Sequence, residues 1–258
     1  MSLPDSNNKW INKVFPKFIL PYIELSRLDR PIGSWLLMWP CWWSLGLAIK
    51  NEYPNQDLEI YNILLLFALF AVGSIIMRGA GCTYNDIIDR KYDLKVSRTS
   101  KRPLPSGTIS VKKAIFWMIF QAFFGFLILM SMNSLTIFLG IISLFTILIY
   151  PFMKRITWWP QLFLGLSFNY GALLGWTSLT GFISLEPIII YIAGIFWTLG
   201  YDTIYSLQDI EDDILAGIKS SSIKLGKKLT AFLIFSYTVT IFLFVFIGLK
   251  LSLDWIFW

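Results

Sequence analysis

Long apolar runs recur along the whole chain, and they restrict its fold more than any other feature. The 258 residues are 56% hydrophobic and only 15% charged, with a mean hydropathy of +0.63. In a soluble domain, about a quarter of the residues are charged. Each apolar run is long enough to cross a hydrocarbon core of about 30 Å, so we expect a polytopic membrane protein.

Seven segments are predicted to be membrane helices from their length and apolar character. They are Ile32–Ile49, Ile60–Gly81, Ala114–Met132, Leu135–Phe152, Gln161–Leu179, Pro187–Ser206 and Leu229–Leu249. The uncharged stretch 114–153 is too long for one span, and Asn133-Ser134 supplies a hairpin turn within it. The predicted fold class is therefore all-α, a transmembrane helix bundle that forms one integral-membrane domain over residues 1–258.

Lysine and arginine are concentrated in every second loop. The segments before the first span and after the second, fourth and sixth are basic, whereas residues 50–59, 133–134 and 180–186 contain one lysine between them. By the positive-inside rule, the N-terminus and the polar segments 82–113 and 202–228 face the cytoplasm. The N-terminus resembles neither a signal peptide nor a transit peptide, which favours a bacterial inner membrane.

Two acidic clusters lie where apolar spans end, and together they hold eight of the 16 acidic residues. Asn85, Asp89 and Asp93 are spaced four apart, and so are Asp209 and Asp213. In a helix, residues at this spacing share a face, and like charges on that face repel one another. A bound Mg²⁺ would remove the repulsion, and it commonly binds one or two carboxylates together with phosphate oxygens.

The remaining composition excludes other metal chemistry. The chain has no histidine, so an imidazole base or a His-ligated metal is excluded. Cys41 and Cys82 lie within or at the end of apolar spans, far from any C-x-x-C spacing, which argues against a disulfide framework or a zinc site. The net charge of +6 comes from basic loops between spans, so no nucleic-acid partner is expected.

A diphosphate carried by Mg²⁺ would also need cationic donors. Arg98 and Arg102 follow the first acidic cluster, Lys154 follows the fourth span and Arg27 precedes the first. Lysines outnumber arginines 15 to 7, yet all seven arginines lie on the predicted cytoplasmic side. The planar guanidinium suits bidentate phosphate or carboxylate binding, so the arginines are candidate phosphate ligands.

Arg78 and Asp202 lie within apolar spans or at their edges. Ionisable groups are costly there and usually have a function. The alternative is that these two residues form a buried pair with each other.

The two acidic clusters resemble the aspartate-rich motifs of the UbiA superfamily of intramembrane prenyltransferases. The matching patterns are Asn85-x-x-x-Asp89-x-x-x-Asp93 and Asp202-x-x-Tyr205-x-x-x-Asp209-x-x-x-Asp213. Flanking strings look like those of the 4-hydroxybenzoate polyprenyltransferases of ubiquinone biosynthesis. These strings are Arg27-Leu28-Asp29-Arg30-Pro31-Ile32-Gly33, Arg98-Thr99-x-x-Arg102-Pro103-Leu104-Pro105-Ser106-Gly107, Tyr150-Pro151-x-Met153-Lys154-Arg155, Pro160-Gln161-x-x-Leu164-Gly165 and Gly217-Ile218-Lys219-Ser220.

The resemblance implies a helical bundle around a central cavity with a lateral opening to lipid. It implies Mg-dependent transfer of a polyprenyl group from polyprenyl diphosphate to the ring carbon ortho to the hydroxyl of 4-hydroxybenzoate. The implied metal ligands are Asn85, Asp89, Asp93, Asp209 and Asp213. The implied diphosphate contacts are Arg27, Arg98, Arg102, Tyr150, Lys154 and Tyr205. Arg78 would help bind the aromatic acid, and a carboxylate from the set Asp89, Asp93, Asp202, Asp209 and Asp213 would remove the ring proton.

The number of spans departs from the family pattern. Members of the superfamily usually have nine, so this chain is expected to be short at its C-terminus. Three alternatives remain open: a sister prenyltransferase acting on dihydroxynaphthoate or haem, a cation-coupled transporter, and an inactive remnant. A transporter would carry its charges at mid-membrane in broken helices. Beyond its substrates and the lipid bilayer, no obligatory protein partner is expected.

Overall fold

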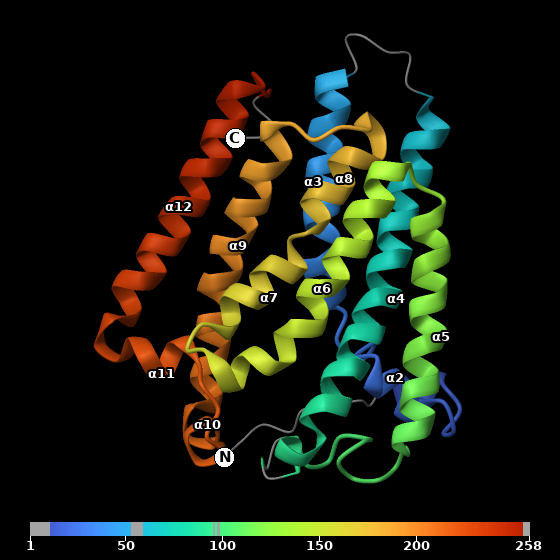
Figure 1. Ribbon diagram of the computed structural model, residues 1–258, viewed down its shortest axis with the longest axis vertical. Helices are drawn as coiled ribbons and strands as arrows, with labels where there is room; N and C mark the ends of the chain where they lie inside the picture. The colour runs from blue at the N-terminus through green and yellow to red at the C-terminus, as the bar shows by residue number, and fades with distance from the viewer. Residues whose placement is uncertain (1–10, 53–58, 95, 97–98, 255–258) are drawn as a thin grey trace. The chain divides into compact units, whose positions relative to one another are not determined.

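The structure is a computed structural model that describes residues 11–52, 59–94, 96 and 99–254. Helices make up the secondary structure throughout this described part, and it contains no strand (Figure 1). The α-helices are α1 (Ile11–Val14), α2 (Leu20–Leu25), α3 (Ile32–Glu52), α4 (Ile60–Asp93), α5 (Val111–Met130), α6 (Ser134–Ile156), α7 (Pro160–Phe168), α8 (Gly171–Thr180), α9 (Leu185–Tyr205), α10 (Ile210–Ala216), α11 (Ser221–Leu225) and α12 (Leu229–Lys250). Two 3₁₀ helices, η1 (Ser206–Asp209) and η2 (Gly226–Lys228), precede α10 and α12. The all-α prediction is therefore confirmed.

The chain divides into two compact units, which are described separately. The first unit consists of Met1–Trp35 and Ala71–Ile128, and the second of Leu36–Phe70 and Leu129–Trp258. The long helices α3 and α4 each contribute residues to both units.

The first unit is held together by a small apolar core and a buried polar contact. Leu25 from α2 packs with Leu104, Ile109 and Ala114, and Leu104 is fully buried. The hydroxyl of Ser26 accepts hydrogen bonds from two α5 side chains, Trp117 Nε1 at 2.8 Å and Gln121 Nε2 at 3.1 Å. These contacts hold Ser26, the residue directly after α2, against α5.

The second unit packs around Trp176 of α8, whose side chain is fully buried. Its cluster includes Ala48 from α3, Ile190 from α9 and Ile247 from α12. At the start of α6, the Asn133 side chain caps the helix by accepting from the Thr136 N–H at 3.0 Å. The break predicted at Asn133-Ser134 within the stretch 114–153 is confirmed, since α5 ends before it and α6 begins there.

Six helices are long and apolar enough to cross a membrane, by length and composition. Six of the seven predicted spans are therefore confirmed, but the prediction of one continuous helix over 161–179 is wrong. That segment forms α7 and α8, which Figure 1 shows as separate helices.

The break between α7 and α8 occurs at Asn169, whose side chain competes for backbone partners. Its Nδ2 donates to the Gly165 carbonyl at 2.9 Å and to Thr198 Oγ1 at 2.8 Å. The hydroxyl of Tyr191 donates to the Leu166 carbonyl at 2.9 Å, so α9 supplies partners near the break. Neighbouring helices make such a break tolerable at membrane depth.

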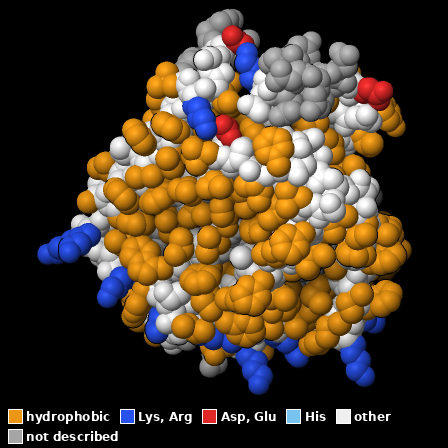
Figure 2. Space-filling view, turned by 45° about the horizontal axis from the view of Figure 1, so that its top comes forward, with side chains coloured by type: hydrophobic (Ala, Val, Ile, Leu, Met, Phe, Trp, Pro, Cys, Tyr) orange, Lys and Arg blue, Asp and Glu red, His pale blue; other side chains and the backbone are white. Residues whose placement is uncertain are grey.

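The outside of the molecule is apolar to an extent typical of membrane proteins. Figure 2 shows a face that hydrophobic side chains cover almost continuously, with Lys and Arg side chains at its margins. Phe116 of α5, Phe145 of α6 and Phe242 of α12 are among the most exposed large side chains. A soluble monomer rarely exposes so large an apolar surface. Together with the six long apolar helices, this surface defines a multi-pass membrane protein.

Candidate functional site

The first acidic cluster lies on the last turns of α4, which continues as a helix through Asp93. The segment that begins at residue 82 is therefore helical for its first twelve residues. Because Asn85, Asp89 and Asp93 follow one another at four-residue intervals, they occupy one stripe of this helix.

Two buried oxygen-bearing side chains on this stripe fit a hard cation. Asp89 is only 8% exposed, and the Asn85 side-chain oxygen Oδ1 is buried with no hydrogen-bond donor in the structure. A buried polar atom without a partner is costly, so its presence needs an explanation. Amide and carboxylate oxygens are ligands that Mg²⁺ accepts, and the donor set therefore fits this metal. The described part of the chain contains no group of three or more acidic or cysteine side chains close enough together to hold a metal ion. A metal held by Asn85 and Asp89 would need further oxygen ligands beyond these two.

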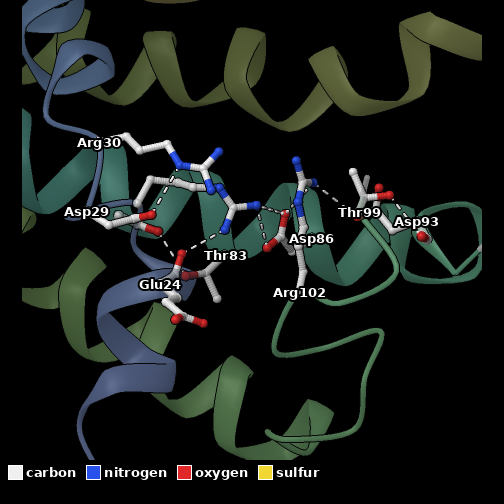
Figure 3. A network of polar contacts seen from close by, with 10 residues as sticks. Glu24, Asp29, Arg30, Thr83, Asp86, Asp93, Thr99 and Arg102 are labelled. Carbon is white, nitrogen blue, oxygen red and sulfur yellow. Dashed lines mark hydrogen bonds and ion pairs between the residues drawn. The ribbon is translucent and has the colours of Figure 1, made fainter. Parts of the chain in front are cut away.

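Asp86 was not among the predicted site residues, but it is the centre of the charged network in Figure 3. Both of its oxygens accept from Arg27 Nη2, at 2.8 and 2.9 Å. Arg102 Nη1 lies 3.5 Å from Asp86 Oδ1 and 3.4 Å from Asp93 Oδ2. The structure thus brings Arg27, Arg102 and Asp93 together around a residue that the sequence motif left without a role.

The loop after α4 holds Arg102 in this position. Thr99 Oγ1 donates to the Asp93 carbonyl at 2.8 Å, and the Arg102 N–H donates to the Thr99 carbonyl at 3.0 Å. Pro103 and Leu104, which follow directly, are buried in the first unit. The Arg-Pro-Leu-Pro string therefore anchors an arginine beside the acidic stripe. Arg98, the other predicted ligand from this loop, lies outside the described residues.

Arg78 lies on α4 seven residues before Asn85, which is two helical turns along the same stripe. Its guanidinium packs directly against Gly33 at the start of α3, where a Cβ would overlap it. Arg78 and Asp202 belong to different units, which are described separately. The pairing alternative stays a prediction.

The second acidic cluster follows the end of α9 as a series of short helices. Asp202 lies in the last turn of α9, Asp209 ends η1 and Asp213 lies in the first turn of α10. Tyr205 is exposed, whereas the three carboxylates are half-buried. Gly217 ends α10 with a positive φ of 69°, a left-handed conformation that favours glycine.

Buried hydroxyl groups attach the segment after α10 to the rest of the second unit. Thr203 and Ser221 share a hydrogen bond of 2.6 Å, and Ser206 donates to Ser222 at 3.0 Å. The Ser221 N–H donates to Gln161 Oε1 of α7 at 3.2 Å. These residues had no predicted role, although Gln161 and the Gly-Ile-Lys-Ser string were part of the family resemblance.

Tyr150 and Lys154 lie on the last turns of α6, close to this same segment. The Lys154 ammonium lies 5.7 Å from the centroid of the Tyr150 ring, and its carbonyl accepts from the Lys219 N–H at 2.8 Å. The Lys219 ammonium donates to the Ile156 carbonyl at 3.1 Å. The second unit therefore joins two predicted diphosphate ligands to the segment that follows the second acidic cluster.

The fold and these residues define a multi-pass helical membrane protein with acidic segments and closely placed cationic side chains. The family model described as the UbiA prenyltransferase family matches residues 37–258. The chain belongs to the UbiA prenyltransferase family.

Curated relatives include three proteins named for 4-hydroxybenzoate transfer. One is the 4-hydroxybenzoate geranyltransferase 1 of Lithospermum erythrorhizon, 47% identical over 84% of this chain and 68% of that protein. Two are mitochondrial 4-hydroxybenzoate polyprenyltransferases. The Arabidopsis thaliana enzyme is 41% identical over 95% of this chain and 59% of its own length. The Homo sapiens enzyme is 46% identical over 82% of this chain and 56% of its own length. The chain thus spans between about half and two thirds of the length of these relatives.

Solved structures of UbiA homologues share the fold. One is an apo structure from Aeropyrum pernix K1, with a TM-score of 0.73, 24% identity, and coverage of 88% of this chain and 82% of that one. Another, from Archaeoglobus fulgidus, is bound to GPP and Mg²⁺, with a TM-score of 0.63, 20% identity, and coverage of 89% and 78%.

Proposed function

We propose that this chain transfers a polyprenyl group from polyprenyl diphosphate to the ring carbon ortho to the hydroxyl of 4-hydroxybenzoate, with Mg²⁺ as cofactor. The acidic stripe of α4 carries the proposal, because the buried Asn85 Oδ1 has no hydrogen-bond donor and two arginines lie beside the stripe. Arg102 pairs with Asp86 and Asp93, and Arg27 pairs with Asp86. The names of relatives 41–47% identical support the acceptor and the prenyl donor. The A. fulgidus homologue with GPP and Mg²⁺ supports the cofactor.

The metal ligands in this proposal are Asn85, Asp89, Asp93, Asp209 and Asp213. Bound Mg²⁺ would neutralise charge on the departing diphosphate, a form of electrostatic stabilisation that usually dominates such steps. Arg27, Arg98, Arg102 and Lys154 add cationic hydrogen-bond donors to the same phosphates, and Tyr150 and Tyr205 add hydroxyl groups.

The reaction breaks the bond between the allylic carbon and the diphosphate oxygen, and the electron pair leaves with the diphosphate. The ring carbon then bonds to the allylic cation while Arg78 holds the acceptor carboxylate. A carboxylate of the chain, with Asp202 among the candidates, takes the ring proton and restores aromaticity. Apolar helices exclude bulk water, which would otherwise capture the cation.

The cellular setting is part of the same proposal. The proposed location is a bacterial inner membrane. Lysine and arginine are concentrated in every second loop, which favours an orientation with the N-terminus and both acidic segments in the cytoplasm. Polyprenyl diphosphate would then enter from the lipid and 4-hydroxybenzoate from the cytoplasm.

Membranes containing the protein test the proposal when they receive Mg²⁺, geranyl diphosphate and radiolabelled 4-hydroxybenzoate. We expect lipid-extractable label that requires Mg²⁺ and disappears after chelation with EDTA. Asp89→Ala removes a buried ligand and should lower the rate by about a hundredfold or more. Glu211→Ala, which removes an exposed carboxylate outside the proposed ligand set, is the matched control and should retain activity.

Three outcomes would count against the proposal. They are no labelled product at any Mg²⁺ concentration, full activity in Asp89→Ala, and a clear preference for dihydroxynaphthoate over 4-hydroxybenzoate. The last would favour a sister prenyltransferase.

A further inference from the structure

Asp86 differs from its neighbours on α4 in what surrounds it. It is 1% exposed, and both of its oxygens are engaged by one arginine nitrogen at 2.8 and 2.9 Å. A buried carboxylate is stable only when its charge is compensated, and here two guanidinium groups provide the compensation. The charge of Asp86 is therefore already compensated by these two guanidinium groups, without a metal ion.

Helix geometry places Asp86 beside Asp93, at the edge of the proposed metal stripe. It is one residue after Asn85, so its side chain leaves the helix about 100° further round. Asp93 is seven residues later and returns to nearly the same direction as Asp86. This register explains how Arg102 lies 3.5 Å from Asp86 and 3.4 Å from Asp93.

Arg27 is held by more than its ion pair. It lies just after the end of α2 and is one of two non-glycine residues with a positive φ in the described chain, at 55°. The N–H groups of Leu28 and Arg27 donate to the Ile23 and Glu24 carbonyls, each at 3.1 Å, which is a common left-handed ending of a helix. The preceding Ser26 is fixed by Trp117 and Gln121 of α5. Arg27 Nη1 also donates to the Glu24 carbonyl at 2.7 Å. The ending of α2 and these contacts thus direct this guanidinium to Asp86.

We propose that Asp86 is a positioning residue that holds the guanidinium groups of Arg27 and Arg102 ready to bind the diphosphate. The inference rests on the proposed function, since it takes the diphosphate as the ligand of these arginines. Asp86 itself touches neither the metal nor the substrate. It acts by fixing two charge-assisted donors before the substrate arrives, which removes the cost of ordering them on binding.

Asp86→Asn tests the proposal in the purified protein in detergent, because this substitution preserves the shape of the side chain while removing its charge. We expect the KM for geranyl diphosphate to rise by about tenfold or more, as expected for the loss of charge-assisted positioning. The Mg²⁺ concentration for half-maximal activity should stay within about twofold of the unsubstituted value, since no metal ligand has changed. Asp89→Asn provides the contrast, because it should shift the Mg²⁺ requirement.

A double-mutant cycle separates positioning from a merely structural ion pair. If Asp86 acts through Arg27, Asp86→Asn should raise the KM less in an Arg27→Gln background than on its own. A structural role would lower the melting temperature of the variant without raising the KM of the molecules that remain folded. If Asp86→Asn does not fold, Asp86→Glu keeps the charge and should show a raised KM with an unchanged Mg²⁺ requirement.

Binding is also measured directly, from the quenching of tryptophan fluorescence by geranyl diphosphate with Mg²⁺. Absence of product from the unsubstituted protein would overturn the proposed function, whereas this binding comparison would still test Asp86. The positioning role is overturned by wild-type affinity in folded Asp86→Asn, by a shift in Mg²⁺ requirement equal to that of Asp89→Asn, or by additive effects in the cycle.

Discussion

One glycine of the first unit leaves the space that a long cationic side chain occupies. The guanidinium of Arg78 occupies the space that a Cβ at Gly33 would need. Gly33 is itself buried at the start of α3. The final glycine of the Leu-Asp-Arg-Pro-Ile-Gly string therefore has a physical role, which is to leave room for an arginine that is 45 residues away in sequence.

Gly33→Ala should displace Arg78 without unfolding the chain, since a flexible side chain can move away from the new methyl group. If Arg78 binds the carboxylate of the aromatic acid, the KM for 4-hydroxybenzoate should rise by about tenfold, as for the loss of a charge-assisted hydrogen bond. The KM for geranyl diphosphate should stay nearly constant. Gly46→Ala, in the same helix but with open space at the Cβ position, is the matched control. Equal changes in both KM values would contradict this role for Gly33.

At the scale of the elements, α8 packs closely against α3 because both facing positions on α8 are glycines. A Cβ at Gly171 would overlap the Cys41 sulfur, and one at Gly175 would overlap the Cys41 carbonyl oxygen. Small residues that allow backbones to approach are a common basis of helix association in membranes. The contact supports α8, which is only ten residues long and carries the buried Trp176.

Gly175→Ala should destabilise the second unit, because the atoms it meets are backbone and cannot rotate away. Overpacking of this kind costs about 1–3 kcal/mol. Thermal unfolding in detergent should show a lower midpoint than that of the unsubstituted protein. Gly81→Ala, which meets nothing within 4 Å, should leave the midpoint unchanged or raise it slightly through better helix propensity. Equal midpoints for the two variants would mean that the close approach of α3 and α8 contributes nothing measurable.

The pattern of the sequence predicted most helices, and the exceptions have local physical causes. The end of an apolar run indicates where a helix leaves the hydrocarbon core, and not where the helix itself ends. The second span was therefore predicted to end at Gly81. The helix itself continues to Asp93 because nothing in the polar sequence stops it. In the opposite direction, uniform hydropathy hid the break at Asn169, which depends on tertiary partners such as Thr198.

The candidate site was predictable to the extent that its residues follow helical spacing. Asn85, Asp89 and Asp93 were identified from their four-residue intervals alone. Asp86 shares none of those intervals, and its role depends on Arg27, which is 59 residues earlier. Pairings of this kind are set by tertiary packing, and a single sequence does not record them.

At the scale of the whole molecule, loops rich in lysine and arginine alternate along the chain with loops that have few basic residues. The loop before α5 carries Lys101, and the first turn of α5 carries Lys112 and Lys113. The α8–α9 connection from Gly181 to Ser184 has no charged residue. A membrane protein retains its basic loops on the cytoplasmic side. The N-terminus and both acidic segments are then predicted to be cytoplasmic.

Cysteine labelling in intact bacterial cells tests this orientation, because the native Cys41 and Cys82 are both buried and should give little background. Phe182→Cys and Lys112→Cys each add one accessible thiol at an exposed position. Residue 182 is predicted to lie on the periplasmic side of the membrane and residue 112 on the cytoplasmic side. A membrane-impermeant maleimide should label Phe182→Cys in intact cells, because its loop is predicted to face the periplasm. It should label Lys112→Cys only after the inner membrane is permeabilised. The reverse pattern would place the acidic segments outside the cytoplasm, away from the predicted supply of 4-hydroxybenzoate, and would contradict both the orientation and the proposed route of that substrate.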